Sequence, residues 1–217
     1  MFAPSPSFFY PPAPAMPAPV ATSIDDLLAR YEKLLSVGAP KVFKSLQPGL
    51  TDAEIDALEA KHSFKLTPDL RALYRWRNGT PRSAGLNAFP DHWFVPLDEA
   101  ILERDTLTKQ VKAQSKAQQA LYASVAGHRD PWLGLIVDAA GDGHFYDPNR
   151  TEPQGSFFFS FAEDATFTFY PAFRNYLAAV IAGHETGVFG FGAYGSETID
   201  FVKAQALWDQ YGAPNER

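Results

Sequence analysis

The segment from Trp132 to Tyr170 constrains the fold more than any other part of the chain. It contains short apolar and aromatic runs that are separated by the turn sequences Gly141-Asp142-Gly143 and Asp147-Pro148-Asn149. Glycine, proline, asparagine and aspartate favour tight turns, whereas aromatic residues favour strands. Connections this short join antiparallel neighbours, because parallel strands need a long crossover. We therefore expect an antiparallel meander of three or four strands. The expected strands are residues 133–137, 144–146, 155–161 and 166–170.

Helical spacing of apolar residues dominates the chain on both sides of this meander. Thr51 and Glu54 have the spacing of a capping box, and Pro68 follows Thr67 at a first helical position. The expected helices are residues 22–38, 51–62, 67–78, 98–125, 171–183 and 196–211. The last of these helices is expected to be capped by Ser196 and to carry Ile199, Val202 and Trp208. A short strand is expected at residues 92–95. Helices precede and follow the strands and do not alternate with them. This order predicts an α+β fold with a single antiparallel or mixed sheet flanked by helices.

The two ends of the chain differ in composition from its middle. Residues 1–21 hold seven prolines, and proline lacks an amide donor and fixes φ, so we expect a disordered, Pro-rich tail there. It has no basic start, and prolines interrupt its apolar runs, so it lacks the pattern of a secretory signal. Near the other end, GVFGFGAYG (187–195) predicts a glycine-aromatic loop. We expect a domain over 22–183, with an added N-terminal helix, and a C-terminal loop-and-helix extension over 184–217.

Cysteine content and charge exclude several classes of function. The chain has no cysteine, which excludes disulfides, thiolate zinc sites, iron–sulfur clusters and cysteine nucleophiles. A net charge of −6 argues against a protein built mainly to hold nucleic acid. No apolar run is long enough to span a membrane. These features favour a soluble, cytoplasmic protein, and we expect no cofactor and no metal site.

Acidic residues are concentrated on the expected meander. Residues 130–170 carry seven acids against Arg150 alone. The seven are Asp130, Asp138, Asp142, Asp147, Glu152, Glu163 and Asp164. They form either a solvated face, which is the common role of surface charge, or a docking surface for a basic partner. Most aromatic residues of the segment are expected in the core, but an exposed aromatic face edged by carboxylates would be an interface.

The histidines allow an alternative from another class, a hydrolase. His144 lies close in the sequence to Asp142 and Asp147, and a carboxylate can orient an imidazole for acid–base chemistry. No GxSxG or phosphate-loop motif accompanies this group, and no two histidines have the spacing of a zinc site. The sequence therefore provides a candidate acid–base pair without a nucleophile.

Four segments, in one order along the chain, carry a resemblance to a known family. They are PGLTDAEIDALEAKHSFKLTPDLRALYRWRNGT (48–80), FVPLDEA (94–100), WLGLIVDAAGDGHFYDP (132–148) and GSFFFSFAED…FTFYPAFRNYLAAVIAG (155–183). Together they resemble the SMI1/KNR4 family, also called the SUKH superfamily. The resemblance implies an α+β fold and a protein-binding role. Many bacterial members are immunity proteins that sequester a cognate toxin, and fungal members are regulators of cell-wall synthesis and signalling.

The preferred hypothesis is a non-catalytic immunity protein that blocks a toxin domain by steric occlusion. A regulatory scaffold, which would gather partners through the Pro-rich tail and the sheet, is the first alternative, and a His/Asp-dependent hydrolase is the second. No catalytic residue is expected under the preferred hypothesis, and the partner would be a basic protein. The expected partner-binding residues are Asp142, His144, Asp147, Glu163, Asp164, Phe189, Phe191 and Tyr194.

Overall fold

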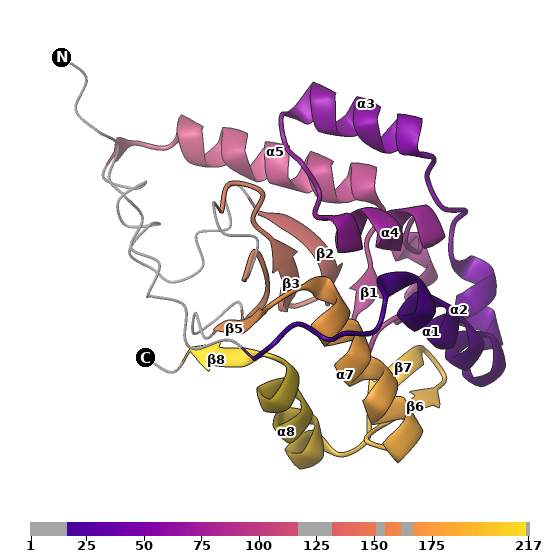
Figure 1. The fold of residues 1–217 in the computed structure, drawn as a ribbon. Coiled ribbons are helices and arrows are strands. Elements are labelled where there is room, and N and C mark those ends of the chain that lie inside the picture. Colours follow the sequence, from indigo (N-terminus) through magenta and orange to yellow (C-terminus); the bar gives the residue numbers. More distant parts are fainter. Residues whose placement is uncertain (1–16, 117–131, 151–154, 162–166, 216–217) are drawn as a thin grey trace.

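The computed structural model of the chain describes residues 17–116, 132–150, 155–161 and 167–215 (Figure 1). Its first half contains α1 (Ile24–Gly38), α2 (Pro40–Ser45), α3 (Asp52–His62), α4 (Pro68–Trp76), a 3-10 turn (Arg82–Ala84), β1 (Trp93–Phe94) and α5 (Leu97–Ala113). Its second half contains β2 (Leu133–Val137), β3 (Gly143–Tyr146), β4 (Phe157–Ser160), β5 (Phe167–Tyr170), α7 (Phe173–Thr186), β6 (Phe189–Gly192), β7 (Gly195–Thr198), α8 (Phe201–Tyr211) and β8 (Ala213–Asn215). The predicted α+β class is confirmed.

The strands β1, β2, β3, β4, β5 and β8 form one antiparallel sheet in that spatial order. The four predicted strands of the meander are its centre, within one or two residues of the expected bounds. The register places Phe145 beside Phe158, and Phe158 beside Phe169, so these three rings share one face. Successive side chains of a strand point to opposite faces. The neighbouring positions on the other face are therefore occupied by Tyr146, Phe157 and Tyr170.

Helix α7 covers this second face of the sheet and also contacts α1 and α8 (Figure 1). The ring of Tyr176 lies 5.7 Å from that of Phe157 and 5.6 Å from that of Tyr170. Most of α7 is buried, including both apolar and small residues around its circumference. A helix that is buried on most of its sides lies between other elements of the fold. Helix α7 is therefore the central element that the sheet, α1 and the C-terminal elements share.

Local capping explains why the first helices begin where the sequence predicts. The Ser23 hydroxyl accepts an amide at the start of α1. Thr51 and Glu54 make both hydrogen bonds of the capping box before α3. The Thr67 hydroxyl caps α4, with Pro68 at the first helical position. Each contact pairs an amide that the helix itself leaves without an acceptor.

Several elements depart from the sequence-based expectations. The helix expected over 98–125 is wrong in length, because α5 ends at Ala113 and residues 114–115 are not helical, and strand β8 is not expected from the sequence. Pro40 starts the short helix α2, in a stretch where no helix is expected from the sequence. The expected glycine-aromatic loop (187–195) contains β6, the hairpin turn and the first residue of β7, since its glycines alternate with aromatic residues at the period of a strand. The prediction that Ser196 caps the last helix is wrong, because Ser196 lies in β7 and the carboxylate of Asp200 caps α8 by accepting the Lys203 amide at 3.0 Å.

The described chain begins with a contact to α7. The Asn175 side chain, which is 1% exposed, donates to the Ala18 carbonyl at 3.2 Å and accepts the Val20 amide at 3.3 Å. Residues 1–16 of the expected tail, and residues 117–125 of the expected long helix, lie outside the described residues. In the parts of the chain that are described, no helix combines the length and apolar content needed to cross a membrane.

Candidate functional site

The acidic residues predicted on the meander occupy different environments. Asp142 is partly exposed in the β2–β3 turn, where its amide and that of Gly141 donate to the Asp138 carboxylate at 2.9 and 2.8 Å. Asp147 is 3% exposed, and its carboxylate accepts the Asn149 amide at 2.9 Å. Asp138 and Asp147 therefore organise the turns at the two ends of β3. Glu163 and Asp164 lie outside the described residues.

His144 lies inside the molecule, among aromatic rings. It is 3% exposed, and its ring centroid lies 4.0 Å from that of Tyr176 and 5.0 Å from that of Phe159. Burial, together with the nearby His92, lowers the pKa of His144 well below its usual value. The imidazole is therefore neutral at pH 7 and lies out of reach of a partner that docks on the surface.

The structure does not assemble the acid–base pair of the hydrolase alternative. Among the described residues, no hydrogen bond or ion pair joins His144 to Asp142 or Asp147, and the Nδ1 atom of His144 is buried without a hydrogen-bond partner. Asp147 follows the last residue of β3, and its carboxylate accepts the Asn149 amide within the next turn. In the same described ranges, no three His, Asp or Glu side chains gather closely enough to hold a metal ion.

The three aromatic residues predicted near the C-terminus divide into two anchors and one exposed ring. Phe189 is 2% exposed and stacks on Trp208 at 5.2 Å. A Cβ atom on Gly183 of α7 would lie 2.1 Å from the Phe189 ring, so this close packing requires glycine. Phe191 is partly exposed and stacks on His184 at 4.3 Å. Tyr194 lies in the turn of the β6–β7 hairpin and is 70% exposed, which leaves its ring available to a partner.

Helix α8 and the residue that precedes its cap present an apolar surface that sequence analysis missed. Ile199, Phe201 and Val202 are 58%, 73% and 83% exposed, and we call them the α8 apolar patch. The inner side of the helix uses Ala204 and Trp208 against α7 and β6. Single exposed apolar residues are common, but neighbouring ones mark interaction surfaces. One signal in the sequence could have indicated this surface. Asp200 is a second candidate N-cap for the last helix, and a helix that begins after Asp200 leaves Ile199 outside it.

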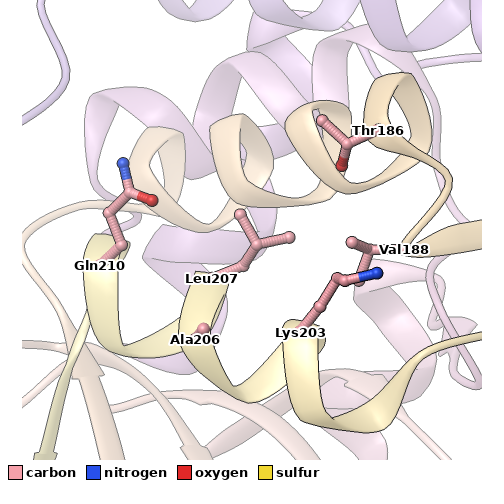
Figure 2. A pocket seen from close by; sticks show the side chains of 6 residues that line it. All are labelled: Thr186, Val188, Lys203, Ala206, Leu207 and Gln210. Carbon is pink, nitrogen blue, oxygen red and sulfur yellow. The ribbon is translucent and has the colours of Figure 1, made fainter.

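A shallow groove of about 380 Å³ adjoins the patch between the end of α7 and α8 (Figure 2). It is lined by Thr186, Val188, Lys203, Ala206, Leu207 and Gln210. Val202 and Ala206 are four residues apart and so lie above one another on the same side of α8. The Ile199 amide donates to the Val188 carbonyl at 2.9 Å. Ile199 and Val202 thus adjoin the groove, whereas Phe201 lies further round α8, on the side of Trp208.

The segment that carries this surface is acidic, although two of its carboxylates are paired, Glu185 with Arg30 and Asp200 with Lys203. Described residues 184–215 carry four acids and one base, Lys203. The acids are Glu185, Glu197, Asp200 and Asp209. The Lys203 ammonium already lies 3.0 Å from the Asp200 carboxylate. Burial lowers the pKa of His184 to about 4, so His184 adds no positive charge at pH 7. The surface combines exposed apolar side chains with negative charge.

Comparison with known proteins identifies two similarities. The model of the SMI1 / KNR4 family (SUKH-1) matches residues 49–179. F-box only protein 3 of Bos taurus is 27% identical over 175 residues, a match that covers 76% of this chain and 35% of that protein. The chain therefore spans about a third of the length of this relative. The α8 apolar patch and the groove lie after the last residue that the family model matches.

Proposed function

Because the chain belongs to the SMI1/KNR4 family, we propose that it is a non-catalytic immunity protein that sequesters a cognate bacterial toxin. The observation that carries the proposal is the family match over residues 49–179. That match supports a protein-binding role of the immunity type in general, and the toxin is the more specific step that we propose. The partner would be blocked by occlusion of its active surface, without any reaction catalysed by this chain.

The predicted contact residues take different parts in this proposal. Tyr194 is accessible, and Asp142 and Phe191 are partly so, which suits direct contact with a partner. Glu163 and Asp164 remain proposed contacts of the same acidic surface. Phe189, His144 and Asp147 are buried, so they would act by holding the neighbouring elements in place. Exposed aromatic rings supply much of the binding energy at interfaces, and carboxylates speed the approach of a basic partner.

A regulatory scaffold is the second candidate function. The similarity to F-box only protein 3 favours a scaffold, because in that protein the matching region is 35% of the length and is therefore one part of a larger protein. A scaffold and an immunity protein would both bind proteins, but only the immunity protein would neutralise a toxic activity. The hydrolase is the least favoured alternative, since His144 is buried and its Nδ1 atom has no hydrogen-bond partner.

Co-expression with the products of neighbouring genes tests the proposal. We expect one neighbouring product to stop growth when it is expressed alone. We expect this chain to restore growth and to co-elute with that product as a stoichiometric complex in size-exclusion chromatography with light scattering. A neighbour that binds this chain without being toxic would favour the scaffold. If no neighbouring product is toxic and none binds, the immunity proposal is wrong.

A further inference from the structure

We propose that the α8 apolar patch and the adjoining groove bind a basic, amphipathic segment of a partner protein. The inference rests on the proposed protein-binding function and names a surface and a partner chemistry for it. The surface lies outside the region that the family model matches. It would therefore be a property of this chain and not of the family as a whole.

The exposed side chains provide the apolar half of the argument. Ile199, Phe201 and Val202 are each more than half exposed, although the helix that carries two of them is well anchored by Trp208. The helix is held in place by its inner side, so its folding does not need these three side chains to be apolar. Covering them would remove apolar area from water, which favours association.

The groove supplies a place for one apolar side chain of the partner. Val188, Ala206 and Leu207 give it an apolar lining between the two helices (Figure 2). The polar groups at its edges already have partners: the Thr186 hydroxyl donates to the Ala182 carbonyl at 2.8 Å, and Lys203 pairs with Asp200. An apolar group can therefore enter without leaving these hydrogen-bonding groups unpaired.

The charge around the groove selects the partner among the conceivable occupants. Glu185 is paired with Arg30 at 2.7 Å and Asp200 with Lys203 at 3.0 Å, so the net negative charge of the described residues 184–215 comes from Glu197 and Asp209. A second copy of the chain would bring the same carboxylates against themselves in a symmetric contact, and like charges disfavour such an interface. Residues 1–16 of the chain carry no charged side chain and would leave the carboxylates unused. A segment with lysine or arginine beside its apolar residues matches both features.

A fluorescence titration with a defined probe tests the inference. The chain has no cysteine, so Gln210→Cys creates a single labelling position at the edge of the groove for an environment-sensitive dye. The probe is a synthetic helix with leucine on one face and lysine on the other. The comparators are a peptide of the same composition without the apolar face and a leucine–glutamate helix. We expect saturable binding of the leucine–lysine helix, at least about ten times tighter than either comparator, that weakens with added salt.

Substitutions on α8 supply the matched control. The double variant Phe201→Ser, Val202→Ser should weaken probe binding at least tenfold. The double variant Val37→Ser, Leu102→Ser changes side chains that are 77% and 66% exposed on α1 and α5, and it should leave binding unchanged. All four side chains are exposed, so both variants should melt within a few degrees of the original chain. Thermal denaturation followed by circular dichroism checks that they do.

Several outcomes would overturn the inference. Equal affinity for the leucine–glutamate helix would show that negative charge does not select the partner. An α8 variant that binds the probe as tightly as the control variant does would show that the probe binds elsewhere on the protein. Sedimentation that shows a dimer broken by the α8 substitutions would assign the surface to a second copy. Deletion of residues 1–16 that tightens probe binding tenfold would assign it to the chain's own N-terminus.

The inference and the immunity proposal can fail separately. A toxin complex that survives the α8 substitutions would preserve the immunity proposal and refute this surface. Saturable binding of the leucine–lysine helix without any toxic neighbour would support the surface and refute the immunity proposal.

Discussion

The strand meander (133–170) and the C-terminal unit of β6, β7 and α8 (189–211) are both rich in aromatic residues, but they place them differently. In the meander, most rings on both faces of the sheet are buried, as Phe158 and Tyr170 illustrate, and Phe161 after β4 is the more exposed one at 43%. In the C-terminal unit, Phe189 is buried, whereas Tyr194 and Phe201 are more than two-thirds exposed. The comparison indicates that the meander uses its aromatic residues for stability and that the C-terminal unit keeps some of them for contact.

The reason for the difference is the number of elements that each region packs against. The described strands β3 and β4 have neighbours in the sheet on both sides, and α7 covers one face. The C-terminal unit packs on α7 mainly through Phe189 and Trp208, and the outer side of α8 has no covering element within the described residues. An aromatic residue is buried only where a second layer exists to cover it.

The largest expected effect comes from removing one ring in each region. Phe158 is fully buried, and its ring lies 4.8 Å from that of Trp132 and 5.5 Å from that of Phe169. Phe158→Ala should lower the free energy of unfolding by about 3–5 kcal/mol, because it leaves a cavity. Phe201→Ala should change it by less than about 0.5 kcal/mol. Urea denaturation of both variants measures the contrast, and equal losses would contradict our account of the two regions.

The same contrast decides what could be predicted from the sequence. The strands of the meander and the starts of α1, α3 and α4 depend on local signals: alternation, turn residues and capping side chains. The capping box of Thr51 and Glu54 needs no information from the rest of the chain. These elements were therefore predictable, and so was the α+β order.

The parts that could not be predicted depend on contacts between distant segments. His144 is close to two aspartates in the sequence, but its environment is set by Tyr176 of α7. The exposure of Val202 depends on which side of α8 packs against α7 and β6. Strand β8 forms only because its backbone reaches the free edge of β5. None of these contacts leaves a local signal in the sequence.

A second prediction uses acid to compare a histidine in each region. Burial lowers the pKa of His144 in the meander, and burial lowers that of His184 beside the C-terminal unit to about 4. The unfolded chain takes up these protons near pH 6.5, before the folded chain does. The stability that these two rings contribute should therefore be complete above about pH 6.5 and fall as the pH is lowered towards 4. Each ring should contribute a loss of roughly 1.4 kcal/mol for each pH unit between its unfolded and folded pKa values.

Denaturation at a series of pH values measures this loss. The His184→Gln variant should lose less stability between pH 6.5 and 4 than the original chain, and the remaining loss should include the contribution of His144. The hydrogen bond between His184 and the Ser196 hydroxyl, at 2.9 Å, makes glutamine the closest neutral replacement. A stability that stays constant or rises as the pH falls would contradict the burial of both rings.

A third prediction concerns Asn175, on the helix that both regions share. Deletion of residues 1–16 should leave stability within about 0.5 kcal/mol, because the prolines of this segment predict a disordered tail. Deletion of residues 1–21 should cost about 1–3 kcal/mol, because it removes both backbone partners of the buried Asn175 amide. The difference between the two melting curves is the measurement. Equal stability of the two deletions would show that water replaces Ala18 and Val20 at no cost.

The smallest expected effect distinguishes the acidic groups of the two regions. Asp142 belongs to the meander, whereas Glu197 and Asp209 belong to the C-terminal unit, and all three lie at least partly at the surface. If the partner docks on α8, Glu197→Gln with Asp209→Asn should slow its association by about threefold to tenfold at low salt, since nearby charges steer a basic protein. Asp142→Asn should slow it by less than about twofold, because exposed charges are screened within roughly 8–10 Å.

Stopped-flow association at several ionic strengths separates these two rates. Both effects should vanish at high salt, because added ions screen exposed charges, while the dissociation rate should change little. Association that slows as much for Asp142→Asn as for the pair on the C-terminal unit would mean that the partner also contacts the meander. The two regions would then share one interface, because the acidic β2–β3 turn and the α8 apolar patch would both approach the same basic protein.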